Sequence, residues 1–196
     1  MQYWTLNEFN DFIKHVDDIT YKTIFWLLFY TGMRKGELLA LTIDDIDLEN
    51  KTININKTCS YVTGKGYIVT TPKTLESKRI IYINDKTIDV IKEYLKYISN
   101  QYEFKKDTPL FSINGALIPK ETLRRNFKYY QRLAGVKDIR LHDLRHSHVA
   151  LLINLGQDPL TIKKRLGHSD ITITLNTYGH LYDDAQKKLA NKLDEI

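Results

Sequence analysis

Residues 20–30 form a segment that is apolar on nearly every side, and this segment constrains the fold more than any other stretch of the chain. A helix that is hydrophobic all round has to be surrounded by other elements, so we expect it at the centre of the core. Its longest apolar run, residues 24–30, is far too short to cross a bilayer. A chain of 196 residues is long enough to bury a sizeable core in one domain.

Periodicity and capping residues predict further helices around this segment. Thr5 and Glu8 have the spacing of a capping box, which predicts a helix that buries Phe9 and Phe12. Other helices are expected at residues 35–40, 84–100, 119–135, 142–155, 158–167, 169–178 and 183–195.

Between these helices the pattern changes to the alternation that is typical of strands, at residues 52–56, 66–70 and 79–83. Short connections favour one antiparallel sheet of these three strands. The fold class is therefore mostly α with a small three-stranded antiparallel sheet, an α+β domain. No linker-like stretch divides residues 1–196, so we expect a single domain.

Positive charge is concentrated in one part of the chain. Residues 120–145 contain eight basic and three acidic side chains, an excess that equals the net charge of +5 of the whole chain. Such a block is either a solvated helix face or a surface for a polyanion such as nucleic acid, and charge alone does not decide. The N-terminus has no signal-peptide pattern, and a single cysteine, Cys59, argues against disulfides, so we expect a soluble intracellular protein.

Two histidines four residues apart, His142 and His146, raise the possibility of a metal site, with His168 as a third ligand. The pattern resembles that of zinc proteases with Asp143 in place of glutamate. Asp143 is one methylene too short for the expected base, and Arg145 would repel a dication. We therefore expect no metal.

A different set of side chains suffices for phosphoryl transfer without a metal. Two arginines can hold the non-bridging oxygens of one phosphate, histidines can donate hydrogen bonds or move protons, a lysine can protonate a leaving alkoxide, and a tyrosine can act as a nucleophile. The candidates are Arg34, Lys73, His142, Arg145, His168 and Tyr178. Spacing alone does not show that they converge.

Several motifs together resemble the tyrosine recombinase (phage integrase) family. They are TGMRKGELLAL, PKTLESKR, LHDLRHSH and RLGHSDITITLNTYGH, in the order that is typical of the family, and the likeness extends from about Tyr3 to the end of the chain. The resemblance implies the fold of the family's catalytic domain. It also implies roles for individual residues. Arg34 resembles the first catalytic arginine, Glu37 the supporting acid, and Lys73 the general acid that protonates the 5′-hydroxyl.

The remaining roles fall near the C-terminus. His142 and Arg145 match the family's His-x-x-Arg motif, His168 matches a position held by histidine or tryptophan, and Tyr178 matches the nucleophile. His146 then has no place in the implied catalytic set, and we expect it to serve structure.

The resemblance implies site-specific DNA recombination that integrates or excises a phage or another mobile element. The nucleophile forms a 3′-phosphotyrosine and frees a 5′-hydroxyl, and a partner strand then reverses the step, so no ATP, metal or other cofactor is needed. The implied partner is double-stranded DNA, bound by a homotetramer that exchanges C-terminal helices, here residues 183–193, while the isolated domain is expected to be monomeric. The basic helix would contact the DNA backbone through Arg124, Arg125, Lys128 and Arg132.

Members of the family normally carry an N-terminal core-binding domain that completes a clamp around DNA, and by this resemblance the chain starts where the catalytic domain starts. It is then either a piece of a longer protein, which we favour, or a naturally minimal protein. We expect it to be encoded by a bacterium or phage, to act in the cytoplasm, and to bind DNA weakly and recombine poorly alone. Two alternatives remain: a type IB topoisomerase, which shares the chemistry but relaxes supercoils, and a DNA-binding module that has lost catalysis.

Overall fold

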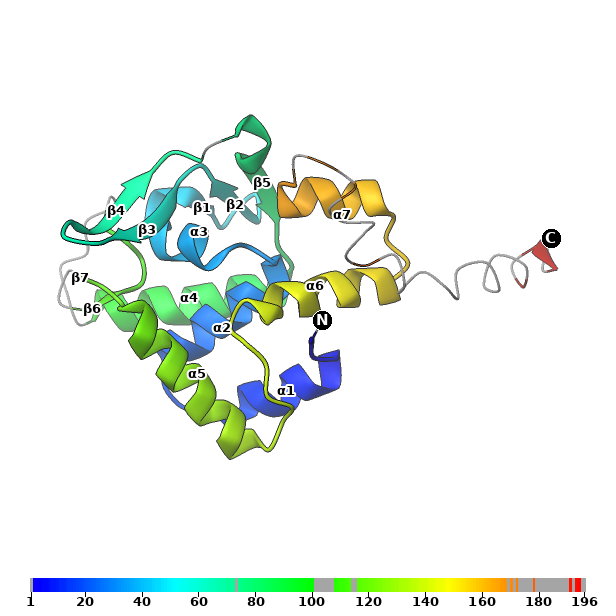
Figure 1. Cartoon of the computed structure of the whole chain (residues 1–196), viewed down its shortest axis with the longest axis horizontal. Coiled ribbons are helices and arrows are strands. Elements are labelled where there is room, and N and C mark those ends of the chain that lie inside the picture. The colour runs from blue at the N-terminus through cyan, green and yellow to red at the C-terminus, as the bar shows by residue number, and fades with distance from the viewer. Residues whose placement is uncertain are drawn as a thin grey trace.

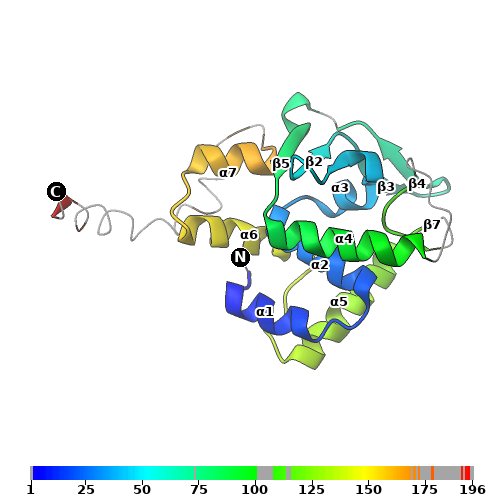
Figure 2. The ribbon, with the colours of Figure 1, turned by 180° about the vertical axis from the view of Figure 1, so that it is seen from behind.

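The computed structural model describes residues 2–72, 74–100, 108–113 and 116–168, together with residues 170, 172, 178, 191, 193 and 194. Helix α2 (Ile19–Thr31) lies at the centre, as its apolar sequence predicts. The other helices are α1 (Leu6–Lys14), α3 (Lys35–Ala40), α4 (Asp85–Ser99), α5 (Lys120–Ala134), α6 (Asp143–Asn154) and α7 (Pro159–Leu166). Helices α1, α3, α4, α5 and α6 all pack against α2 (Figures 1 and 2).

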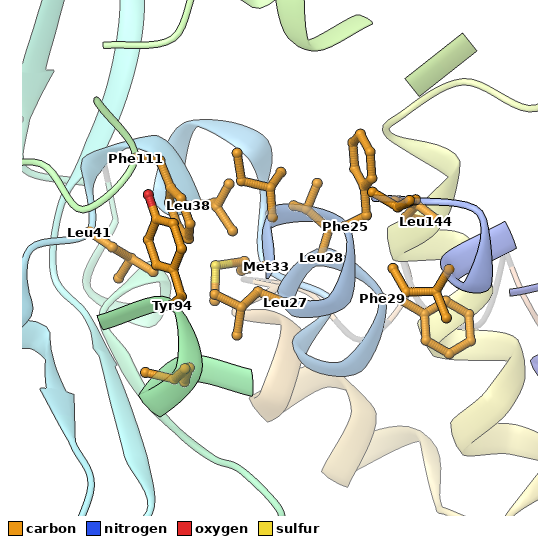
Figure 3. Close-up of a cluster of buried hydrophobic side chains, with 14 of the residues drawn as sticks. Phe25, Leu27, Leu28, Phe29, Met33, Leu38, Leu41, Tyr94, Phe111 and Leu144 are labelled. Carbon is orange, nitrogen blue, oxygen red and sulfur yellow. The ribbon is translucent and has the colours of Figure 1, made fainter. Parts of the chain in front are cut away.

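The core is built around side chains of α2. Phe25, Leu27 and Leu28 of this helix belong to one buried cluster that also contains Leu38 and Phe111 from neighbouring segments (Figure 3). The same helix also meets α1 through aromatic stacking. The rings of Phe9 and Phe29 lie 3.8 Å apart between centroids and 4° from parallel.

Local signals in the sequence set the helix ends. The predicted capping box of α1 is present, with the Thr5 side chain accepting from the Glu8 amide and the Glu8 carboxylate accepting from the Thr5 amide at 2.7 Å. Asp158 caps α7 in the same way, by accepting from the amides of Leu160 and Thr161. Gly32 ends α2 in the left-handed conformation that glycine adopts at little cost.

The fold class is confirmed, but the three-stranded sheet has different members from those predicted. Its order is β1 (Ile46–Asp47), β2 (Thr52–Ile55) and β5 (Arg79–Tyr82), all antiparallel. The predicted strand at residues 66–70 is β4 (Gly66–Thr70), and it instead pairs with β3 (Thr58–Val62) in a separate hairpin.

The hairpin has a structural reason. Strand β3 lies directly against α3, so closely that a Cβ atom on Gly36 would come 2.5 Å from the carbonyl oxygen of Cys59. The chain therefore leaves the sheet after β2, packs on α3, and returns to the sheet only at β5. A second two-stranded pair, β6 (Ser112–Ile113) and β7 (Ala116–Leu117), precedes α5.

Helix α7 packs beside β5 and lies near α6 in both views (Figures 1 and 2). The end of α2, the start of β5, α6 and the end of α7 thereby meet in one region, although they are far apart in the sequence. Among the helices in the described part of the chain, none is long and apolar enough to cross a membrane.

Candidate active site

A buried carboxylate holds two arginines at this meeting point. Glu37, on α3, is 3% exposed and accepts hydrogen bonds from the backbone amide and Nη1 of Arg34 at 2.8 and 2.9 Å. Arg79, at the start of β5, donates to both oxygens of the same carboxylate, Nη1 at 3.1 Å and Nη2 at 2.8 Å. Burial raises the pKa of Glu37, but the hydrogen bonds and charges of Arg79 and Arg34 outweigh it, so the pKa lies below its ordinary value.

Arg145 is the third arginine of the region, and helix ends hold its guanidinium. Nη1 donates to the carbonyl of Gly32 at 2.6 Å, and Nη2 donates to the carbonyl of Leu166 at 2.9 Å. These carbonyls lie at the C-termini of α2 and α7, where the helix dipole favours a cation. Burial and the charge of Arg34 lower the pKa of Arg145 to about 9, which leaves the group charged at neutral pH.

Two of the predicted histidines lie in the field of these arginines. His142 directly precedes α6, and desolvation and the charge of Arg145 lower its pKa. His168 directly follows Gly167, the C-cap of α7, and burial together with the charges of Arg145 and Arg34 lowers its pKa to about 4. Both imidazoles are therefore neutral at pH 7 and can donate or accept hydrogen bonds.

Tyr178 lies near Arg145 as well. Its side chain is 2% exposed and packs in a small cluster with Val149 and Ile153 of α6 and with residues of α7. Burial raises its pKa to about 12, and the charge of Arg145 opposes the rise. The hydroxyl lies 2.5 Å from Nδ1 of His146.

Of the predicted site residues, the structure thus places Arg34, Glu37, His142, Arg145, His168 and Tyr178 in one region. Lys73 lies outside the described residues, as does nearly all of the predicted C-terminal helix at residues 183–193.

Sequence reasoning missed two residues of this region. Arg79 belongs to the PKTLESKR motif, but we assigned it no role, and its contact with Glu37 spans 42 positions of the chain. His146 was expected to serve structure, whereas its ring contacts the hydroxyl of Tyr178. The only sequence signal for His146 is its spacing of four from His142, which also fits a pair of metal ligands.

The histidine pair does not form a metal centre with other ligands in the described part of the chain. The rings of His142 and His146 are perpendicular, with centroids 5.3 Å apart, and Nδ1 of His146 faces Tyr178. No group of three or more potential ligands is placed to hold a metal ion among the residues that the structure describes.

A basic groove adjoins the site. It has a volume of about 850 Å³, lies along α5 and the segment that follows it, and reaches His142 and Lys35. Six basic and two acidic side chains line it. Arg124 and Arg132 are exposed there, whereas Lys128 pairs with the Asp138 carboxylate and donates to the carbonyl of residue 139 at 3.2 Å. Arg125, on the same helix, is exposed as well.

The sequence model of the phage integrase family matches residues 2–185. The ICEBs1 integrase of Bacillus subtilis (strain 168) is 40% identical over 203 residues, covering 100% of this chain and 55% of that protein. The integrase of Staphylococcus phage L54a is 34% identical over 178 residues, covering 85% of this chain and 49% of that protein. The chain thus spans about half the length of the curated relatives it matches.

Solved structures agree with these matches. The Tn1549 transposon integrase, in complex with transposon right end DNA, aligns with a TM-score of 0.81 and 26% identity, over 97% of this chain and 65% of that chain. The XerA recombinase aligns with a TM-score of 0.76 and 26% identity, over 98% of this chain and 65% of that chain. These are tyrosine recombinase structures, and their likeness extends over nearly all of the chain. The chain therefore belongs to the phage integrase family.

Proposed function

We propose that this chain is the catalytic part of a site-specific DNA recombinase, which cuts and rejoins DNA strands through a 3′-phosphotyrosine to integrate or excise a phage or another mobile element. The observation that carries the proposal is the position of the Tyr178 hydroxyl in the same region as Arg34 and Arg145. Family membership and the DNA complex of the Tn1549 transposon integrase support it.

The charges of the region favour a bound anion. Arg34, Arg79 and Arg145 carry three positive charges, and Glu37 opposes them with one negative charge. The side chain of Arg34 is 40% exposed, so it can meet a ligand from solvent while Glu37 holds it in place. A phosphodiester fits this excess, because guanidinium groups bind phosphate oxygens with paired hydrogen bonds.

The proposed reaction uses these groups together. Tyr178 attacks phosphorus, Arg34 and Arg145 stabilise the charge that develops on the non-bridging oxygens, and neutral His142 and His168 add hydrogen bonds. Lys73 protonates the departing 5′-oxygen in this proposal. Because one phosphodiester replaces another, the reaction needs no ATP, and the arginines, histidines and lysine take the roles that a metal would otherwise fill in this proposal.

The DNA backbone would follow the basic groove along α5. Arg124, Arg125 and Arg132 are exposed and can contact phosphates without reading sequence. Lys128 would contribute less than predicted, because it already pairs with Asp138.

We further propose that the full protein acts in the cytoplasm as a homotetramer on DNA and exchanges C-terminal helices between protomers, whereas the isolated domain is a monomer. Light scattering of the protein with and without DNA would test the assembly. A tetramer that forms only with DNA supports it, and a monomer on DNA contradicts it.

The activity can be tested without knowing the target site. The protein is incubated with a pool of nicked duplexes of random sequence, in which cleavage releases a short strand and traps the covalent product. Wild-type protein should form a covalent adduct that survives denaturation, and Tyr178→Phe should form none. Tyr97→Phe, an exposed position on α4, is the matched control and should behave as wild type.

The outcomes separate the alternatives. An adduct with Tyr178→Phe would show that another residue is the nucleophile. Binding of DNA without any adduct, by a protein that is folded, would favour a DNA-binding module. Relaxation of supercoils without joining of two duplexes by the full protein would favour a topoisomerase.

A further inference from the structure

The hydroxyl of Tyr178 is a poor nucleophile as the fold places it. The phenol is buried, and burial raises its pKa to about 12, far above neutral pH. A weak nucleophile of this kind is activated by an adjacent base that is itself oriented by a third group. The structure supplies such a base one residue after Arg145.

His146 lies on α6 with Nδ1 2.5 Å from the Tyr178 oxygen. A phenol is the hydrogen-bond donor in this pair when Nδ1 carries no proton. The imidazole is half-buried, and burial followed by the charge of His142 lowers its pKa, so it is neutral and able to accept a proton at pH 7. The rings also pack together, with centroids 5.7 Å apart.

Asp143 completes the arrangement. Its Oδ1 lies 3.8 Å from Nε2 of His146, one helical turn away and on the side opposite Tyr178. The carboxylate is 2% exposed and is fixed by Arg140, which donates to it from its amide at 2.8 Å and from Nη2 at 2.8 Å. A fixed negative charge at this place would stabilise an imidazolium, as the carboxylate does in other nucleophile–histidine–acid arrangements.

We propose that His146 is a further catalytic residue, a general base that removes the proton from the Tyr178 hydroxyl as that oxygen attacks phosphorus; the assignment rests on the proposed function. In the forward step the Tyr178 O–P bond forms, the P–O5′ bond breaks, and the phenolic proton moves to Nδ1 of His146. The departing 5′-oxygen receives its proton from the general acid. In the reverse step a 5′-hydroxyl attacks phosphorus and gives its proton to the deprotonated general acid, the Tyr178 O–P bond breaks, and protonated His146 returns its proton to the departing phenolate.

The titration of His146 depends on all the charged and titratable groups that face it. They are His142, Asp143, Arg140, Arg145 and Tyr178. Asp143 favours the protonated form, whereas His142 and the two arginines disfavour it. Above the pKa of His146 the base is present, and Arg145 keeps its charge well below its pKa of about 9, so the cleavage rate of wild-type protein should be nearly constant from pH 7 to pH 8.

The variant that tests this is His146→Asn. Its amide oxygen can accept the hydrogen bond from Tyr178 but cannot take up the proton, so it separates proton transfer from positioning. We expect single-turnover cleavage of the nicked substrate to fall by about 10²–10⁴-fold, the usual contribution of general base catalysis. The remaining rate should rise about tenfold per pH unit, because the phenol must then ionise before attack. His15→Ala, which removes an exposed histidine at the C-cap of α1, should leave rate and pH profile unchanged.

A sulfur atom in place of the bridging 5′-oxygen distinguishes a base from an acid. Sulfur leaves without protonation, so this substrate restores activity to variants that lack the general acid. The His146→Asn defect should persist with it. Full restoration by sulfur would overturn the proposal, and so would a rate within about threefold of wild type, far below the effect of a general base.

Nuclear magnetic resonance provides a readout that does not require DNA. Long-range ¹H–¹⁵N spectra should show His146 protonated at Nε2 with Nδ1 free of a proton, and Tyr178→Phe should shift the Nδ1 resonance. An Nδ1-protonated ring would overturn the proposal. If wild-type protein forms no adduct at all, the proposed function fails and the general base role fails with it, whereas a slow variant beside an active wild type concerns His146 alone.

Discussion

Replacing Glu37 by glutamine should destabilise the fold, because this carboxylate holds two arginines of the site. The carboxylate accepts four hydrogen bonds, two from Arg34 and two from Arg79, and it is 3% exposed. Removing one partner of a buried ion pair costs about 3–5 kcal/mol, because the other charge remains buried without compensation. Arg79, with a side chain 6% exposed, would be that charge.

The lower end of this range is the better expectation for Glu37→Gln. Glutamine keeps the volume and one acceptor oxygen, and it removes the cost of burying a carboxylate. Its amide group would nevertheless face N–H donors of Arg79, and Arg145 would lose a nearby negative charge. We expect a loss of about 3 kcal/mol in the free energy of unfolding, measured by urea denaturation at pH 7.

Glu121→Gln is the matched control. This carboxylate is 67% exposed and lies 3.7 Å from Arg124, also one helical turn away. An exposed pair of this kind contributes less than about 1 kcal/mol. Equal effects of the two substitutions would refute the idea that burial makes the Glu37 cluster important.

Acidification gives a second test of the same reasoning. The pKa of Glu37 is lower in the folded than in the unfolded state. The ionised carboxylate therefore stabilises the fold fully above the unfolded-state pKa, and this stabilisation is lost as pH falls through the folded-state pKa. The difference between wild-type protein and Glu37→Gln should therefore shrink below pH 4.5. A difference that stays constant down to pH 3 would contradict the ion-pair account.

Three further predictions concern other parts of the site. Gly32→Ala should lower the free energy of unfolding by about 2–5 kcal/mol, because φ is +65° and the new Cβ would lie 2.5 Å from Cδ2 of His148. Gly135→Ala, with the same φ but no neighbour within 4 Å, should lower it by only about 1–2 kcal/mol, and urea denaturation measures both. Arg124→Ala should weaken DNA binding and reduce the slope of log K against log salt by about 0.9, measured by fluorescence anisotropy, and an unchanged slope would exclude a phosphate contact. The pKa of His168 is about 4, below that of an unfolded histidine, so stability should fall between pH 6.5 and pH 4, and His168→Gln should make that fall shallower.

The helices of this fold were largely predictable from the sequence, because their signals are local. Thr5 and Glu8 lie three residues apart and cap α1 on their own, and Asp158 caps α7 through amides two and three residues away. The position of α2 in the core followed from its composition alone. Each of these predictions needed only neighbouring residues.

The sheet was not predictable in the same way. Residues 66–70 alternate as a strand should, and nothing in that alternation names the partner strand. The choice of Thr58–Val62 depends on packing between that strand and α3, where Gly36 allows the close approach. Pairing is decided by tertiary contacts, which a single sequence does not display.

The site residues also divide into those that local motifs predict and those that only tertiary contacts reveal. The motifs and the family resemblance pointed to Arg34, Arg145 and Tyr178, but not to Arg79 or His146. Glu37 lies 42 residues from Arg79, and Tyr178 lies 32 residues from His146. No local rule links such positions, and only tertiary contacts, of Arg79 with Glu37 and of Tyr178 with α6, bring them together.

Arg145 shows why the site and the fold cannot be separated in this chain. Its guanidinium ties the end of α2 to the end of α7, so the contacts that close the domain also fix a cation beside Tyr178. Arg34, by contrast, is held through one carboxylate and remains 40% exposed. A change at Arg145 must therefore alter stability and anion binding together, whereas a change at Arg34 can remove an anion contact and leave the core intact. Arg34→Ala is for this reason the sharper probe of phosphate binding: it should weaken binding or cleavage strongly while the midpoint of urea denaturation shifts little.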